Sequence, residues 1–274
     1  MALNLDGSDA YIDHGSATNL DDVVPISVLA WIRATEFTTT RGIVTKHTST
    51  TARWHLRYST VGNFVFIRAY GTTDATSTTT GGPLASGVWT FVAATFDGTN
   101  APKIYCGTRT TLVTECSYST QQAPVGTLNS EGFAVLRAGL QSASTTANCL
   151  IGDVAWLGIW NVVLSLSQIQ QQQYTMATTS GCVLNCMYGW DGTGTQQDRS
   201  GSGNPGTVTG GTVADHLPLS CGFGAPSCAG AVPLPLPEPI LIGQDSGAVR
   251  ASSSLLAQRR ESARHRAVTT RIWR

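Results

Sequence analysis

The sequence has few charged residues, no long apolar run and no leader pattern at its start. Charged residues occupy 12% of the 274 positions, whereas threonine, serine and glycine are abundant. No apolar run approaches the roughly 20 residues that a membrane helix needs, so we expect no helical membrane span. Residues 1–6 begin a strand-like pattern without a basic or apolar leader. We therefore expect either a removed signal or release by another route, such as cell lysis.

The charge that is present is unevenly distributed along a formally neutral chain. Residues 250–274 hold seven of the 17 basic residues and one of the 17 acidic ones, which leaves 10 basic and 16 acidic residues in the body. We expect this basic tail to dock on a second copy of the chain or on capsid or tail proteins, and the alternative is a solvated tail with no partner. Nucleic acid is not expected, because only Trp273 could stack on bases. The expected docking residues are Arg250, Arg259, Arg260, Arg264, Arg266 and Arg271.

The tail follows a proline-rich segment, residues 225–239, which predicts an extended, polyproline-like chain. We therefore place a domain boundary near residue 219. Residues 1–219 form the predicted globular domain, and residues 220–274 form an extended C-terminal arm.

The sequence contains seven cysteines, an odd number, so they cannot all form disulfides within the chain. We expect disulfides between the cysteines that lie close in sequence, namely Cys106–Cys116, Cys221–Cys228 and Cys182–Cys186. Cys149 is left over. The alternative is a set of free thiols in a reducing compartment. A zinc site is disfavoured, because the spacings match no common zinc pattern.

Residues 87–97 are the stretch around which the rest of the chain is organised. Apolar side chains occupy both sides of an extended strand here, which predicts a strand buried on both faces. Several further segments alternate in the same way and are separated by turn residues, at 3–13, 24–33, 42–46, 53–58, 63–70, 103–106, 133–138 and 149–160. One helix is expected at 165–174, with Ser165 as its N-cap. Residues 72–80 are expected to form a threonine-rich loop. The pattern predicts an all-β, two-sheet antiparallel jelly-roll sandwich with one short helix.

These segments, in this order, resemble the laminin G-like jelly rolls of the concanavalin A-like lectin/glucanase superfamily. The resemblance is carried by residues 3–12, 26–32, 43–46, 87–98 and 150–169. One departure concerns residues 187–191 and 197–210, which resemble a segment that usually precedes the first strand. We expect this segment to complete the same sandwich, as in a circular permutant, and the alternative is the start of a second repeat.

The resemblance raises the question of catalysis, because the superfamily includes glycosidases. The glucanase members place their carboxylates in a Glu-x-Asp-x-x-Glu pattern along one strand, and no such pattern occurs here. No nucleophile elbow, zinc-protease motif or phosphate-binding loop occurs either. We therefore expect no enzymatic activity.

The resemblance also implies a structural calcium ion. Asp6, Asp9 and Asp153 are hard oxygen ligands near the places where this family often holds calcium. The alternative is that Asp6 and Asp9 hydrogen-bond within their own turn.

A sugar would need an aromatic platform beside planar polar groups. The candidates on neighbouring predicted strands are Trp54, His55, Arg57 and Tyr70. In the alternative, Trp54, Leu56 and Tyr58 face inward, and His55 and Arg57 form a solvated face.

Together these expectations favour a non-enzymatic module for assembly or adhesion, with a cell-surface glycan as a candidate ligand. The missing leader, the paired cysteines and the arm favour a location on a virion surface, as a phage decoration or tail component. The alternatives are a secreted bacterial carbohydrate-binding module, which would be extracellular, and a relic of a glycosidase.

Overall fold

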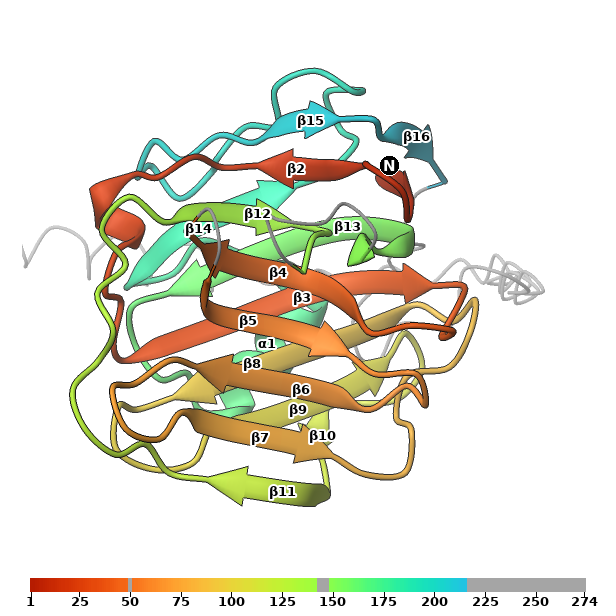
Figure 1. The fold of residues 1–274 in the computed structure, drawn as a ribbon. Helices are drawn as coiled ribbons and strands as arrows, with labels where there is room; N and C mark the ends of the chain where they lie inside the picture. The colour runs from red at the N-terminus through yellow and green to blue at the C-terminus, as the bar shows by residue number, and fades with distance from the viewer. Residues whose placement is uncertain (49–50, 142–147, 216–274) are drawn as a thin grey trace, which may run out of the picture. The chain divides into compact units, whose positions relative to one another are not determined.

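The computed structural model describes residues 1–48, 51–141 and 148–215, and shows two β-sheets stacked face to face (Figure 1). The predicted all-β sandwich is confirmed, since every strand pairing is antiparallel and one α-helix is present in the described part. Cys221, Cys228, the proline-rich segment and the tail arginines lie outside the described residues. No helix in the described ranges is long and apolar enough to cross a membrane.

The first sheet, sheet A, contains eight strands. In spatial order it runs β10 (Thr114–Glu115), β9 (Lys103–Thr108), β8 (Thr90–Phe96), β3 (Ile26–Ala34), β13 (Ile151–Trp160), β1 (Ala2–Asp6) and β16 (Thr212–Ala214). The eighth strand, β14 (Cys182–Met187), pairs with the second half of β13.

The second sheet, sheet B, lies in front of sheet A in Figure 1 and also contains eight strands. Its order is β11 (Tyr118–Gln122), β7 (Ala75–Thr79), β6 (Phe64–Arg68), β5 (Ala52–Tyr58), β4 (Arg41–His47), β12 (Val135–Ala138), β2 (Tyr11–Asp13) and β15 (Thr207–Thr209). A short 3₁₀ helix, η1 (Thr18–Leu20), follows β2.

Strand β8 is buried on both faces, as its sequence predicts. Val92 and Phe96 point into the core between the sheets. Phe91 and Ala93 point the other way, into a second apolar cluster on the outward face of sheet A. Both faces are apolar because neither reaches water, and each buried aromatic side chain contributes roughly 2–3 kcal/mol through the area it removes from solvent.

The core between the sheets follows the period-two alternation of the strands. On β5, Trp54, Leu56 and Tyr58 point inward, and Trp54 lies 6.3 Å from Phe66 between ring centroids. The inward half of that alternative is therefore confirmed, whereas His55 is buried at 9% exposure and does not belong to a solvated face.

Helix α1 (Leu166–Thr175) covers only part of the outward face of sheet A. Ser165 caps it through a capping box with Gln168, which satisfies two backbone donors of the first turn. Trp31 Nε1 donates to Gln173 O at 3.0 Å, and Ile169 packs in the same aromatic cluster. The end of the face that carries β1 and β16 has no such helix over it, and this end holds the pocket described below.

The sequence analysis missed β7 and β11 of sheet B. Residues 72–80 are not a loop, because they contain β7, and β11 pairs with β7 at the edge of sheet B. The inward positions of β7 are Ala75, Ser77 and Thr79, so its alternation separates small buried residues from half-buried threonines rather than apolar from polar ones. Threonine favours strands through its branched side chain, which a count of apolar residues overlooks.

The C-terminal strands join both sheets. β14 pairs with β13, β15 with β2, and β16 with β1. The segment after the helix therefore completes the same sandwich, which is the arrangement that the sequence favours over a second repeat.

Candidate binding pocket

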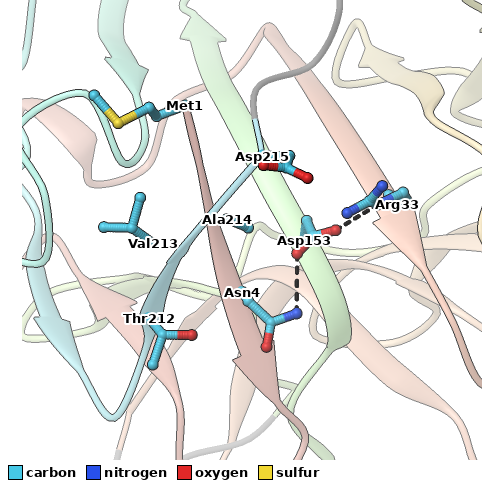
Figure 2. A pocket seen from close by; sticks show the side chains of 8 residues that line it. All are labelled: Met1, Asn4, Arg33, Asp153, Thr212, Val213, Ala214 and Asp215. Atoms are coloured by element: carbon cyan, nitrogen blue, oxygen red, sulfur yellow. Dashed lines mark hydrogen bonds and ion pairs between the residues drawn. The ribbon is translucent and has the colours of Figure 1, made fainter.

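An open hollow of about 570 Å³ lies on the outward face of sheet A, beyond the end that the helix covers. Figure 2 shows its lining, which comes from β1, β3, β13 and β16 and the residue after it. The lining residues are Met1, Asn4, Arg33, Asp153, Thr212, Val213, Ala214 and Asp215. Strands that are far apart in the sequence therefore meet in one polar site.

Three polar side chains form a row across the floor of this hollow. The strand register sets Asn4 of β1 directly opposite Asp153 of β13, and Asp153 directly opposite Arg33 of β3. Arg33 Nε donates to Asp153 Oδ2 at 2.5 Å, and Asn4 Nδ2 donates to Asp153 Oδ1 at 2.9 Å (Figure 2). We call these three residues the Asn-Asp-Arg row.

The carboxylate at the centre of the row is almost completely buried. Asp153 is 2% exposed, while the side chain of Arg33 is 32% exposed. Burying a carboxylate is costly unless it is paired, and here both oxygens have a donor. The Arg33 guanidinium also lies over the Trp89 ring, 5.2 Å from its centroid, which holds it in place from the other side.

A glycine permits this close packing of strands. Gly152 precedes Asp153 and has φ = +134°, and a Cβ atom there would lie 2.0 Å from Arg33 O. A larger residue would push β13 away from β3 and break the row, so the sequence Gly-Asp at 152–153 is part of the site's construction.

Chemically, the hollow presents the Asn4 amide and the Arg33 guanidinium, both held by the buried Asp153 carboxylate, beside Thr212 of β16. Such a set accepts and donates hydrogen bonds to a ligand that carries several hydroxyl groups. A second carboxylate, Asp215, lines the same hollow. Of the two carboxylates, Asp153 makes an ion pair with Arg33.

The four residues predicted to contact sugar do not form one site. Trp54 lies in the core at 2% exposure. Tyr70 packs edge-on against Phe96, and its hydroxyl donates to Gly98 O at 3.3 Å. His55 and Arg57 point outward from sheet B, on the opposite side of the strand from Trp54.

The three aspartates predicted to hold calcium are not brought together as a ligand set. Asp6 Oδ1 accepts from Ser8 N at 2.9 Å and closes its own turn. Asp153 is occupied by Arg33 and Asn4. Across the described ranges, no group of three His, Cys, Asp or Glu side chains could hold a metal ion. The arrangement of these residues gives the calcium prediction no support.

The described cysteines are free thiols in this structure. Cys106 lies on β9 and Cys116 directly follows β10, which pairs with β9, and their sulfur atoms are 3.0 Å apart. The predicted disulfide between them therefore has its partners in contact and stays a prediction. Burial raises the pKa of Cys149 to about 11, which keeps that thiol protonated.

The predicted pair Cys182–Cys186 is wrong. Both residues belong to one extended strand, β14. Four residues along a strand span roughly 13 Å, whereas the Cα atoms of a disulfide lie within about 7 Å of each other.

The sequence analysis singled out one member of the row, Asp153, but predicted it to be a calcium ligand. Asn4 and Arg33 were missed, although each is a polar residue on the outward side of a strand whose inward side is apolar. That outward polarity was the available signal, but it does not indicate which strands are neighbours.

Comparison with known proteins agrees with the fold. A laminin G model of the concanavalin A-like lectin/glucanases superfamily matches residues 6–170. No curated protein matches the chain. Among solved structures, a candidate carbohydrate-binding protein from Bacteroides ovatus has a TM-score of 0.56 at 18% identity. That match covers 78% of this chain and 59% of the other, so the chain spans well under two thirds of its length.

Two further structures are similar at lower scores. The CBM40 of a Ruminococcus gnavus IT-sialidase, bound to alpha2,3 sialyllactose, has a TM-score of 0.46 at 12% identity, with 62% of this chain and 94% of that chain covered. Domains LG4-5 of the mouse laminin alpha1 chain have a TM-score of 0.42 at 16% identity, with 61% and 43% covered. Likeness at these identities extends to the fold alone.

Proposed function

Because this chain belongs to the concanavalin A-like lectin/glucanases superfamily, we propose that it is a non-catalytic module that binds a glycan in the hollow of sheet A. The observation that supports this most is the Asn-Asp-Arg row, a fixed set of polar groups in an open hollow. Its amide and guanidinium groups are held by the buried carboxylate between them before any ligand arrives, which lowers the entropy cost of binding. A glycan is also the candidate ligand class of the Bacteroides ovatus protein that shares the fold.

The hollow suits a hydroxyl-rich ligand of small size. Sugars present hydroxyl groups in pairs, and the planar amide of Asn4 and the guanidinium of Arg33 can bind such pairs, while the buried Asp153 carboxylate holds both groups in place. Val213 and Ala214 add apolar surface at the β16 side, against which the C–H face of a sugar ring can pack.

We retain the virion surface as the proposed setting, with a phage decoration or tail component as the specific form. Its support is the sequence alone, namely the closely spaced cysteines and the proline-rich, basic arm. The alternative setting is a secreted bacterial carbohydrate-binding module. Detection of the chain in purified particles, as opposed to the surrounding medium, separates the two.

The binding test uses the full chain on a glycan array, followed by calorimetric titration of the strongest neutral oligosaccharide. Asn4→Ala removes one donor and one acceptor from the hollow and leaves the Arg33–Asp153 ion pair, so we expect at least tenfold weaker binding. Asn19→Ala is the matched control, because Asn19 makes one hydrogen bond to Ser202 O outside the hollow. Unchanged affinity in Asn4→Ala would refute the site.

The proposal that the chain does not cleave the glycan has its own test. The array hits are incubated with the protein, and newly formed reducing ends are measured. Release of reducing ends that disappears in Asp215→Asn would show that the two carboxylates of the hollow act on the glycan, and the chain would then be a glycosidase.

A further inference from the structure

A second, smaller hollow of about 230 Å³ lies where β8 begins and β9 ends. Its lining residues are Val88, Trp89, Thr108, Arg109 and Thr110. We call it the arginine hollow. Trp89 belongs to the apolar cluster on the outward face of sheet A, which places the arginine hollow on the same face as the hollow of sheet A. Val88 and Arg109 are exposed, so a ligand can reach them from solvent.

The strand register aligns the arginine hollow with the Asn-Asp-Arg row. At the start of β8, Trp89 lies beside Arg33 of β3, whose guanidinium is 5.2 Å from the Trp89 ring centroid. On the other side of β8, Thr90 stands opposite Thr108, so the residues that flank this pair, Trp89 and Arg109, are also neighbours. The Asn-Asp-Arg row therefore continues across β8 to the end of β9.

The extended row is much longer than one sugar ring. It crosses sheet A from β9 through β8, β3, β13 and β1 to β16, which makes five steps between neighbouring strands. Neighbouring strands lie roughly 4.8 Å apart, so the row is about 24 Å long. Its length suits an oligosaccharide that runs across the strands.

The stack of Arg33 on Trp89 separates the two hollows. Arg33 lines the hollow of sheet A and Trp89 lines the arginine hollow, so a ligand that occupies both passes over this stack. The indole nitrogens of Trp31, Trp156 and Trp160 donate to acceptors within the chain at 3.0, 2.7 and 2.9 Å. The indole nitrogen of Trp89 has no such acceptor in the described ranges, which leaves a donor beside the arginine hollow.

Helix α1 holds the turn that carries Arg109 in place. The Gln173 side chain is fully buried, and its Nε2 donates to Thr108 O at 2.7 Å and to Thr111 O at 2.8 Å. Its Oε1 accepts from Val113 N at 2.9 Å. Thr108 N also donates to Thr111 Oγ1 at 3.0 Å. The turn is therefore fixed before any ligand arrives, which lowers the entropy cost of binding there.

The two hollows differ in charge. The lining of the hollow of sheet A contains Asp153 and Asp215 against Arg33 alone, whereas the lining of the arginine hollow contains Arg109 and no carboxylate. Arg109 makes no ion pair in the part of the chain that the structure describes. A guanidinium group binds a carboxylate or sulfate group through two parallel hydrogen bonds. The arginine hollow therefore favours an anionic group, and the hollow of sheet A favours a neutral one.

We propose that the two hollows bind one oligosaccharide, with a neutral unit in the hollow of sheet A and an acidic unit in the arginine hollow. Arg109 pairs with the carboxylate or sulfate group of the acidic unit, and the exposed Val88 gives its ring an apolar surface. The sugar chain between them passes over the stack of Arg33 on Trp89. This inference rests on the proposed function, to which it adds the length, the direction and the charge of the ligand.

The test is calorimetric titration of the full chain with matched sugars. They are a neutral oligosaccharide that binds on the array, its single sugars, and the same oligosaccharide with the unit at one or the other end oxidised to a uronic acid. We expect the neutral oligosaccharide to bind more tightly than its single sugars. One of the two acidic forms should bind at least tenfold more tightly than the neutral one, and added salt should reduce this gain, because Arg109 is exposed.

Variants locate the acidic unit. Arg109→Gln should remove the tenfold gain of the acidic form and change the affinity for the neutral oligosaccharide less than threefold. Asn4→Ala should weaken the neutral and acidic forms alike, at least tenfold. Arg199→Gln is the matched control, because Arg199 is also exposed, lies 5.7 Å from the Trp190 ring centroid and lines neither hollow. It should change each affinity less than twofold.

A direct readout comes from the indole N–H of Trp89. Its nuclear magnetic resonance signal, assigned by its loss in Trp89→Phe, should shift on addition of the acidic oligosaccharide and shift little with the single sugars. If no neutral oligosaccharide binds, the proposed function fails. If the neutral oligosaccharide binds but neither acidic form gains affinity, or if Arg109→Gln keeps the gain, this inference alone is overturned.

Discussion

Arg33 and Arg137 occupy equivalent places on the outward faces of the two sheets. Each stands directly opposite an aspartate on the neighbouring strand, Asp153 for Arg33 and Asp13 for Arg137. Each guanidinium also lies over an aromatic ring, at 5.2 Å from the Trp89 centroid and 4.7 Å from the Tyr11 centroid. Sheet A and sheet B therefore carry the same small motif.

The two copies differ in how far the carboxylate is buried. Asp153 is 2% exposed beside an Arg33 that is 32% exposed, whereas Asp13 and Arg137 are 28% and 21% exposed. Water can replace either partner of the second pair but cannot reach Asp153. The comparison shows that the same arginine–aspartate pair can serve two purposes. Where the neighbouring strands bury the carboxylate, the pair forms the fixed floor of a site, and where they leave it partly exposed, the pair contributes little to stability.

The largest expected effect on stability comes from breaking the buried pair, Arg33–Asp153. Arg33→Met should lower the free energy of unfolding by about 2–3 kcal/mol, because it leaves the buried Asp153 with Asn4 alone. This value is below the range for fully buried pairs, since Arg33 is about one third exposed. Urea unfolding measures it. The double variant Arg33→Met, Asp153→Asn should recover part of the loss, and a double variant as unstable as the single one would contradict the explanation.

Much of the fold could be predicted from the sequence, because alternation is a local property. The burial of both faces of residues 90–96, the helix that Ser165 caps and the inward set on β5 all follow from residues next to one another. β7 could not be found in this way, because its inward positions are filled by alanine, serine and threonine. Small buried side chains give no apolar alternation to detect.

The pocket could be predicted only in part, for a physical reason. Asn4, Arg33 and Asp153 meet because β1, β13 and β3 are neighbours in a particular register. Register depends on pairing between segments more than a hundred residues apart, and a shift of one of these strands by a single residue would send its member of the row to the other face. The sequence shows each polar residue of the row, but it does not show that the three residues lie in one site.

A second prediction extends the comparison to a pair with no exposure at all. Arg68 and Glu131 are both fully buried, with 2.6 Å between Nη1 and Oε1. Burial raises the pKa of Glu131 to about 6 from an ordinary 4.5, although Arg68 opposes the shift. A carboxyl group whose pKa is higher in the folded state takes up a proton on folding. Its protonation therefore adds stability as the pH falls from about 6 to about 4.5, by roughly 2 kcal/mol.

The measurement compares the native chain with Glu131→Gln across that pH range. The difference in unfolding free energy should change by roughly 2 kcal/mol in favour of the native chain as the pH falls. The difference is the readout because burial lowers the pKa of His14, His47 and His55, which destabilises both proteins in acid. A constant difference would show that Glu131 has the same pKa folded and unfolded.

The smallest effect on stability is expected from breaking the more exposed pair, Arg137–Asp13. Arg137→Met keeps the aliphatic contact with Tyr11 and removes an ion pair that water already screens, so we expect a loss of about 0.5 kcal/mol in the same urea experiment. Glycan binding in the hollow of sheet A should not change, because Arg137 lies on the other face. A loss as large as that of Arg33→Met would mean that burial of the carboxylate is not what separates the two copies. The difference would then have to come from the aromatic partners, and Trp89→Leu and Tyr11→Leu would become the decisive pair of variants.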